Sequence, residues 1–218
     1  MTNLVLIAKE TIAGRVKTRL HPALTFEQAA TLAAASITDT LRAVEDLPAT
    51  RRILLFDGQV TPADAADFDV IHQVEGTLDV RLAALFNEVT GPTVLIGMDT
   101  PQLTAAMLAP AFEQWPSDVD AFFGPASDGG FWAIGLDAPA GDLILGVPMS
   151  QDDTGRIQLD RLVDAGLNVR MLEELTDVDT IDNAREVAAL VPHSTFARTL
   201  AGFAASTSST ALSRLVNA

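Results

Sequence analysis

The sequence predicts an α/β fold in three layers, with a mostly parallel mixed sheet between two layers of helices. Short apolar runs alternate along the chain with longer segments in which apolar residues recur at helical spacing, as in successive βαβ units. The 218 residues, 48% of them hydrophobic, are enough to bury the core of one such domain. No internal repeat interrupts the alternation.

The chain begins with a predicted strand and helix. Leu4–Ala8 is a continuous apolar run bounded by polar residues, which is typical of a buried strand. A helix is predicted from Thr25 to about Leu47, because its apolar residues share one face. Thr25 and Gln28 have the spacing of a capping box, which marks the start of that helix.

The next elements continue the alternation. Arg52–Phe56 is too short and too apolar for a surface helix and is predicted as the second strand. A turn or short helix is expected at residues 61–66, followed by a weaker strand at Val70–Val74. Gly76 and Thr77 then open a helix with leucines on one face.

The remaining elements follow the same logic of apolar runs, helical spacing and turn residues between them. The predicted strands are Thr93–Met98, Ala121–Phe123, Phe131–Leu136 and Asn168–Leu172, and the predicted helices span residues 104–115, 153–165 and 177–191. One domain is therefore expected over residues 1–205. A spacer rich in serine and threonine and a short C-terminal helix are expected over residues 206–218.

Composition excludes several classes of function. The chain has no cysteine, so it forms no disulfide and offers no thiolate nucleophile. No run of eighteen apolar residues is present, so no membrane span is expected. A formal net charge of -15 argues against a broad basic face for nucleic acid. We expect a cytoplasmic protein.

A cluster of cations near the N-terminus stands out in this acidic chain. Lys9, Arg15, Lys17 and Arg19 surround Gly14 in the loop after the first strand, and the chain has no other lysine than these two. Such a loop holds phosphates with side-chain cations and backbone N–H groups together. The alternative is a solvated loop with scattered charge.

Carboxylates follow two later segments. Asp99 comes directly after the strand Thr93–Met98, where ligands bind in open α/β sheets, although it could also be a turn residue before Pro101. Asp177 and Asp179 are two positions apart, so both side chains could point the same way. Asp179 also has the position of a helix N-cap, a role that is compatible with metal binding by Asp177. Mg²⁺ suits such a site.

Two further residues are candidates at this edge of the sheet. Asp128 precedes two glycines in a tight turn, where those glycines either supply positive φ or let a ligand approach the backbone. Arg81 lies in the first turns of the helix after Thr77 and is either a ligand-binding cation or an ordinary exposed arginine.

Four motifs, in order along the chain, carry a resemblance to a known family. They are the loop from Ala8 to Leu20, the segment Gly97–Leu103, the segment Gly124–Leu136, and Asp177–Thr180. In this order they resemble a bacterial glycosyltransferase-like family with the GT-A, or nucleotide-diphospho-sugar transferase, fold. The sequence is also similar to phospholactate guanylyltransferases and, more distantly, to molybdenum-cofactor guanylyltransferases. Two of these motifs depart from the family pattern, at Thr11 in the first loop and at Phe131-Trp132 after the glycines.

The resemblance implies roles for individual residues. Lys17 and Arg19, with Lys9 and Gly14 in the same loop, are implied to contact nucleotide phosphates, and Arg81 to contact the nucleotide. The metal, Mg²⁺ or Mn²⁺, is implied to be bound by Asp99, Asp177 and Asp179. The implied catalytic residues are Lys17, Asp99 and Asp128.

These observations predict a metal-dependent nucleotidyltransferase. It would move a nucleoside monophosphate from a nucleoside triphosphate to a small phosphorylated acceptor, a reaction that needs positioning and charge stabilisation more than a strong base. The alternatives are a glycosyltransferase that uses a nucleotide-sugar, with Asp128 as base, and a non-catalytic nucleotide-binding protein. The nucleobase, the acceptor and the oligomeric state stay open.

Overall fold

The computed structural model describes the backbone of residues 1–216 and the side chains of residues 1–205. Within them lies one sheet with the strand order β3-β2-β1-β4-β6-β5-β7. The strands are β1 (Asn3–Lys9), β2 (Arg52–Asp57), β3 (Asp69–His72), β4 (Thr93–Ile96), β5 (Ala121–Pro125), β6 (Phe131–Leu136) and β7 (Val169–Met171). All paired strands are parallel except the two pairs that involve β6. The predicted α/β fold with a mostly parallel mixed sheet is confirmed.

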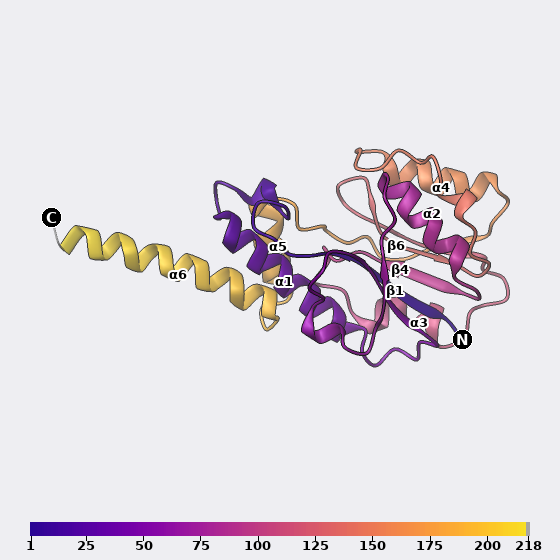
Figure 1. Ribbon diagram of the computed structural model, residues 1–218, viewed down its shortest axis with the longest axis horizontal. Helices are drawn as coiled ribbons and strands as arrows, with labels where there is room; N and C mark the ends of the chain where they lie inside the picture. Colours follow the sequence, from indigo (N-terminus) through magenta and orange to yellow (C-terminus); the bar gives the residue numbers. More distant parts are fainter. Residues whose placement is uncertain (217–218) are drawn as a thin grey trace.

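Helices cover both faces of this sheet (Figure 1). The α-helices are α1 (Phe26–Ala43), α2 (Leu78–Glu88), α3 (Ala105–Phe112), α4 (Thr154–Asp164), α5 (Ile181–Leu190) and α6 (Thr195–Val216). Short 3₁₀ helices are η1 (Thr18–Leu20), η2 (Ala63–Ala65) and η3 (Gly141–Leu143). Helices α2 and α4 lie on one face and α1 and α3 on the other.

The alternation of side chains along β1 explains the two cores. Leu4 and Leu6 point to the cluster shared with α1 and α3, while Val5 points to the cluster shared with α2 and α4. All three are fully buried. A strand that is buried on both faces needs a continuous apolar run, and this run allowed β1 to be predicted from the sequence.

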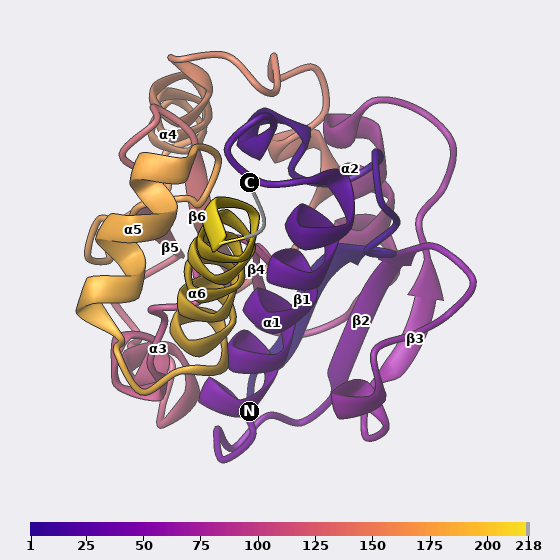
Figure 2. The same cartoon turned by 90° about the vertical axis from the view of Figure 1, so that its left-hand side faces the viewer.

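Helix α1 is longer than the strands and carries a third apolar cluster beyond the sheet. Its start is the predicted capping box, because Thr25 Oγ1 accepts from Gln28 N at 3.2 Å and Gln28 Oε1 accepts from Thr25 N at 2.9 Å. The third cluster joins α1 to η1, α5 and α6 through residues that include Leu20, Leu32 and Phe196. Figure 2 shows α1, α5 and α6 side by side.

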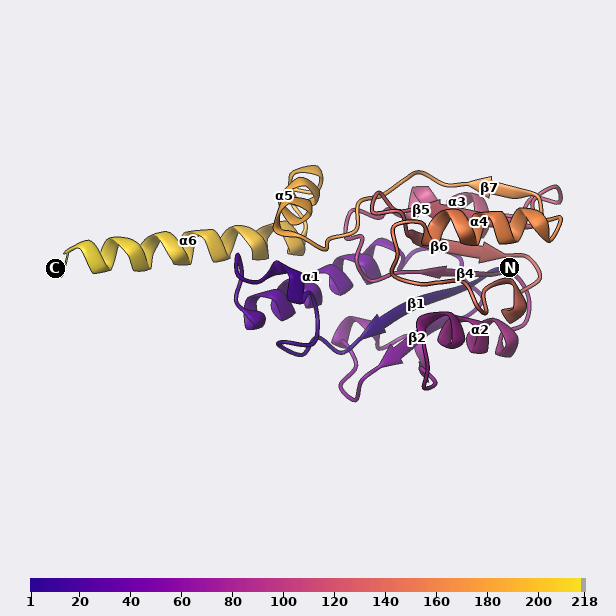
Figure 3. The ribbon, with the colours of Figure 1, turned by 90° about the horizontal axis from the view of Figure 1, so that it is seen from above.

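Helix α6 extends away from the body of the protein (Figures 1 and 3). Its first turn is fixed by Asp39 of α1, whose carboxylate accepts from Thr195 N at 3.0 Å and from Phe196 N at 2.6 Å. The helix continues without a break to Val216, whereas a spacer followed by a short helix was predicted over residues 206–218. A helix that has been nucleated and capped continues through serine and threonine at little cost per residue.

The antiparallel strand β6 decides which loops meet at the edge of the sheet. Because β6 runs against its neighbours, the turn between β5 and β6 lies at the edge where β1, β2 and β4 end. That edge therefore carries Lys9, Asp57, Asp99 and Asp128. Among the helices that the structure describes, none combines the length and the hydropathy needed to cross a bilayer.

Candidate functional site

A pocket of about 520 Å³ opens at this edge. Five chain segments that are distant in sequence line it, together with Leu78 of α2. They are the loop after β1, the segment after β4, the turn between β5 and β6, the segment before α4 and the segment before α5. The predicted site residues among its lining are Lys9, Lys17, Arg19, Asp99, Asp128, Asp177 and Asp179. The structure therefore brings seven of the predicted residues into one cavity.

Lys17 is the buried cation of this pocket. Its Nζ lies 2.9 Å from Asp99 Oδ1 and 2.9 Å from Asp179 Oδ1, and its side chain is only 8% exposed. Burial alone would lower the pKa of Lys17, but the two carboxylates outweigh it and raise the pKa above the ordinary value. Lys17 therefore keeps its charge in a partly dry environment. Its backbone adopts the left-handed conformation, with φ 47°, at the entrance to η1.

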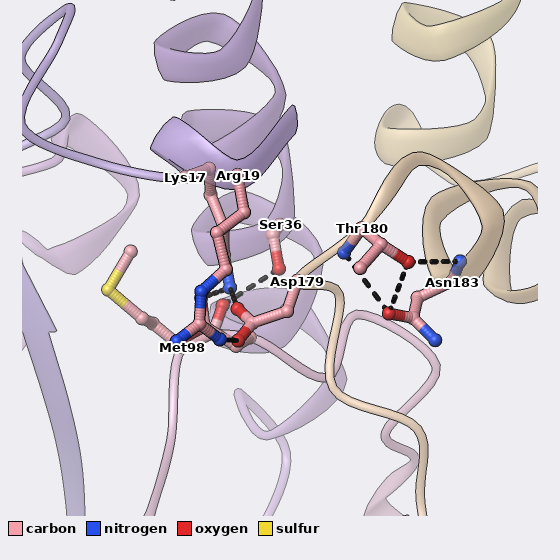
Figure 4. Close-up of polar contacts among 8 residues, drawn as sticks. Lys17, Arg19, Ser36, Met98, Asp179, Thr180 and Asn183 are labelled. Atoms are coloured by element: carbon pink, nitrogen blue, oxygen red, sulfur yellow. Dashed lines mark hydrogen bonds and ion pairs between the residues drawn. The ribbon is translucent and has the colours of Figure 1, made fainter. Parts of the chain in front are cut away.

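Asp179 joins two cations of the loop after β1 (Figure 4). Its Oδ1 accepts from Lys17 Nζ and its Oδ2 accepts from Arg19 Nη1, both at 2.9 Å. Burial opposes ionisation of Asp179, but Lys17 and Arg19 outweigh it and hold the pKa of this carboxyl below its ordinary value. Both carboxylate oxygens of Asp179 are thus already in use.

The predicted N-cap of α5 is wrong by one residue. Thr180, and not Asp179, caps the helix, because Thr180 Oγ1 accepts from Asn183 N at 3.2 Å and Asn183 Oδ1 accepts from Thr180 N at 3.1 Å. This capping box frees the carboxylate of Asp179 to turn toward the loop after β1 (Figure 4). The helix accordingly begins at Ile181.

Asp99 and Asp177 are the two carboxylates with oxygens to spare. Asp99 Oδ1 and Asp177 Oδ1 are buried and accept no hydrogen bond from the described residues; Asp99 Oδ1 contacts Lys17 Nζ as an ion pair without hydrogen-bond alignment. Burial, followed by the charges of Asp99 and Asp128, raises the pKa of Asp177 to about 7. Val178 N donates to the carbonyl of Asp99 at 3.0 Å, which fixes the two segments together.

The predicted three-carboxylate metal site is not assembled in this structure. Among the described residues, no three histidine, cysteine, aspartate or glutamate side chains converge closely enough to hold a metal ion. The reason is that the ammonium group of Lys17 lies between Asp99 and Asp179. Asp177, whose buried Oδ1 accepts no hydrogen bond in the described chain, and Asp99, which contacts Lys17 through Oδ1 only, fit a divalent cation that completes its coordination with water and phosphate. Asp179 instead has both oxygens paired with Lys17 and Arg19.

Arg81 and Gly14 lie elsewhere. Arg81 lines a second pocket of about 330 Å³, which it shares with Lys9 and Arg15. Its guanidinium donates to Asp57 Oδ2 at 3.1 Å and to Gln73 Oε1 at 2.9 Å, so it is fixed by the ends of the neighbouring strands. Lys9 lines both pockets, which makes them adjacent. Gly14, with φ 77°, lines neither.

Sequence reasoning missed one wall of the larger pocket, the segment Met149–Asp152. Gly129 adopts φ 87°, and Gly155 N donates to the carbonyl of Gly129 at 2.7 Å. A Cβ on Gly129 would clash with the carbonyl of Asp152. The predicted close approach to the glycine turn is thus made by another part of the chain. Asp128 stabilises the same turn, because its Oδ1 accepts from Gly130 N at 2.9 Å.

Known structures share this fold. A protein from Desulfovibrio desulfuricans G20, provisionally named a nucleotide-diphospho-sugar transferase, is 24% identical, with a TM-score of 0.78 and 92% of each chain covered. A CMP:2-keto-3-deoxy-manno-octonic acid synthetase in complex with CTP is 12% identical, with a TM-score of 0.54, and covers 88% of this chain and 98% of its own. A nucleotidyl transferase from Methanothermobacter is 14% identical, with a TM-score of 0.53 and the same coverage. At these identities the likeness concerns the fold.

The sequence itself matches one family. Residues 40–151, just over half of the chain, match the family described as "Uncharacterized protein conserved in bacteria (DUF2064)". No curated protein matches the sequence. The resemblance to guanylyltransferases is not tested by these similarities and stays a prediction. The chain belongs to the DUF2064 family and has the fold of the nucleotide-diphospho-sugar transferases.

Proposed function

We propose that this protein is a metal-dependent nucleotidyltransferase whose catalytic unit is residues 1–205. One observation carries the proposal: the pocket of about 520 Å³ is lined by the buried cation Lys17 and by the carboxylates of Asp99 and Asp177. Within the described residues, Asp177 Oδ1 is buried and accepts no hydrogen bond, and Asp99 pairs with Lys17 through Oδ1 only. A fixed cation beside carboxylates with oxygens to spare is the arrangement that phosphate groups and a divalent cation need together. The fold, which is shared with a nucleotidyl transferase and a CTP-bound synthetase, supports the same conclusion.

In the proposed reaction, an oxygen of an acceptor phosphate attacks the α-phosphorus of a nucleoside triphosphate. The bond from that phosphorus to the bridging oxygen breaks, and pyrophosphate leaves with the electron pair. Lys17 and Arg19 bind the phosphate oxygens on which negative charge accumulates. Asp99 and Asp177 would hold Mg²⁺ or Mn²⁺, which supplies neutralising charge to the phosphates when bound. The acceptor phosphate is already anionic, so no strong general base is required.

Nucleotide binding is the first test of this proposal. We expect at least one nucleoside triphosphate to raise the melting temperature, and to do so only with Mg²⁺ present, because ligand binding to the folded state stabilises it by mass action. A nucleotide at a hundred times its Kd adds about 2.7 kcal/mol. The measurement is thermal unfolding with a panel of triphosphates and nucleotide-sugars, with Mg²⁺ or with EDTA. Stabilisation by no nucleotide at all would rule out the proposed activity.

A second candidate, glycosyl transfer from a nucleotide-sugar, is favoured by the free oxygen of Asp128. Among the described contacts, Oδ1 of this side chain bonds to Gly130 N, and Oδ2 accepts no hydrogen bond. Asp128 lines the pocket on the side of the glycine turn and could take the proton of an acceptor hydroxyl there.

Asp128→Asn separates the two candidates. If the protein transfers a nucleotidyl group, we expect the variant to keep its rate within about threefold, because no base is needed. If it transfers a sugar, we expect a loss of two to four orders of magnitude, which is the contribution of a positioned base. Release of pyrophosphate and release of nucleoside diphosphate measure the two reactions. Binding of the donor, measured by calorimetry, should be unchanged in either case and serves as the control.

A further inference from the structure

The contacts of Asp179 are unlike those of its two neighbouring carboxylates. Its two oxygens accept one hydrogen bond each, from a lysine whose side chain is 8% exposed and from an arginine whose side chain is 74% exposed. Within the described chain, Asp177 Oδ1 is buried and accepts no hydrogen bond, and Asp99 contacts Lys17 through Oδ1 only. Asp99 and Asp177 therefore keep an oxygen for a cation, whereas both oxygens of Asp179 face the cations of the loop after β1.

The carboxylate of Asp179 is held by rigid elements. The capping box of Thr180 fixes the first turn of α5 directly after it, and Val178 directly before it is buried in the third apolar cluster. The same cluster contains Leu20 of η1, so the loop that carries Lys17 and Arg19 packs against the segment that carries Asp179. A side chain supported in this way keeps its partners within the narrow geometry that a binding site requires.

The pairing leaves Lys17 able to bind a further anion. An ammonium group has three N–H donors, and two of its directions are taken by Asp99 and Asp179. Arg19 has five donors and uses one with Asp179. Both cations therefore keep donors free, while Asp179 limits the number of conformations that their long side chains adopt.

We propose that Asp179 is a positioning residue, which orders Lys17 and Arg19 for phosphate, and that it is not a ligand of the divalent cation. The proposal rests on the proposed function in one respect, namely that the pocket binds phosphate groups. It assigns the cation to Asp99 and Asp177 alone. Loss of Asp179 releases two long side chains, so affinity for phosphates falls about tenfold, whereas affinity for the cation hardly changes.

The lysine content of the chain makes the ordering directly measurable. Lys9 and Lys17 are the only lysines, so an NMR spectrum of the side-chain ammonium groups contains two signals. Within the described structure, Lys17 is in ion pairs and the Lys9 ammonium is in none. Asp179→Asn should shift or broaden the Lys17 signal and leave the Lys9 signal in place. An unchanged Lys17 signal would overturn the proposal without any reference to a substrate.

Binding of two simple probes tests the role. Manganese is measured by electron paramagnetic resonance and inorganic pyrophosphate by calorimetry, each with wild type, Asp179→Asn and Asp177→Asn in the full chain. We expect Asp179→Asn to bind pyrophosphate about tenfold more weakly and manganese within twofold of wild type. Asp177→Asn should bind manganese about tenfold more weakly and pyrophosphate within twofold of wild type. If Asp179→Asn loses manganese as completely as Asp177→Asn does, Asp179 is a ligand and the proposal is wrong.

Controls separate this result from a general loss of structure or of function. Asp182→Asn is the matched control, because Asp182 is 87% exposed, lies in the first turn of the same helix and pairs only with Arg185 of that helix. It should bind both probes as wild type does. Asp179→Glu, which keeps the charge, should recover part of the pyrophosphate affinity. If wild type binds neither probe but its Lys17 signal still responds to Asp179→Asn, the proposed function fails and the ion pairs are structural only.

Discussion

Replacing Lys17 by methionine will weaken binding of a nucleoside triphosphate by about 10- to 100-fold, the effect of losing one charge-assisted hydrogen bond in a dry site. Lys17 is nearly buried, and the other cations in the lining of the pocket are the more exposed Arg19 and Lys9. Methionine has a similar length but no charge, so the substitution removes the one nearly buried cation among the described residues of the pocket lining. Isothermal titration with the nucleotide that stabilises the wild type measures the change.

The control for Lys17 is another cation outside the pocket. Arg170 lies over the ring of Phe122, 5.8 Å from its centroid, and 3.7 Å from Asp118. Arg170→Ala should leave nucleotide affinity unchanged, and equal effects of the two substitutions would contradict the role of Lys17. Lys17→Met also leaves Asp99 and Asp179 without their shared partner. We therefore expect its melting temperature to rise more with manganese than that of the wild type.

Asp177→Asn will have opposite effects on stability and on function. In metal-free solution the pKa of Asp177 is raised to about 7 from 3.8, so between these pH values the folded protein binds a proton that the unfolded chain has released. The free energy of unfolding of the wild type therefore falls as pH rises from about 4 to about 7 and stays low above that. Asparagine carries no charge, so the variant avoids this loss.

The expected sizes follow from the pKa shift. About three pKa units correspond to at most about 4 kcal/mol, so near pH 8 the variant should melt several degrees above the wild type. Well below pH 3.8 the difference should vanish, because Asp177 is then protonated in both states. The same variant should lose the metal-dependent part of nucleotide binding. Thermal unfolding across pH in EDTA measures the effect on stability. A variant that is less stable than wild type at high pH would contradict the view that burial and the charges of neighbouring carboxylates make ionised Asp177 unfavourable.

Much of the fold was predictable because its signals are local. The buried strand β4 is a continuous apolar run, and the start of α1 is fixed by two residues three positions apart. The N-cap of α5 was predicted wrongly because it depends on a contact between residues that are distant in sequence. Asp179 and Thr180 are both good caps by residue type. The choice between them depends on Lys17, which is distant in sequence and already holds the aspartate.

In the candidate site, too, local sequence signals were predictive, whereas contacts between residues distant in sequence were not. Asp99 was identified because it directly follows an apolar strand, Lys17 because it belongs to a cluster of cations in the loop after the first strand, and Asp177 because it lies two positions from Asp179. That Lys17 would lie between Asp99 and Asp179 could not be predicted, since residue type alone does not distinguish a carboxylate that binds a metal ion from one that binds an ammonium group. The segment Met149–Asp152 was missed because its contact with Gly129 depends on Gly155, which lies in another part of the sequence and carries no signal of its own.

The reversed direction of β6 has a consequence for the diversification of this fold. The residues proposed to bind phosphate come from the first strand loop, the end of β4 and the segment before α5. The opposite wall comes from the turn between β5 and β6 and from residues 149–152, which touch each other. Substitutions in that pair of loops can therefore alter the proposed acceptor side of the pocket while the proposed phosphate-binding side stays unchanged.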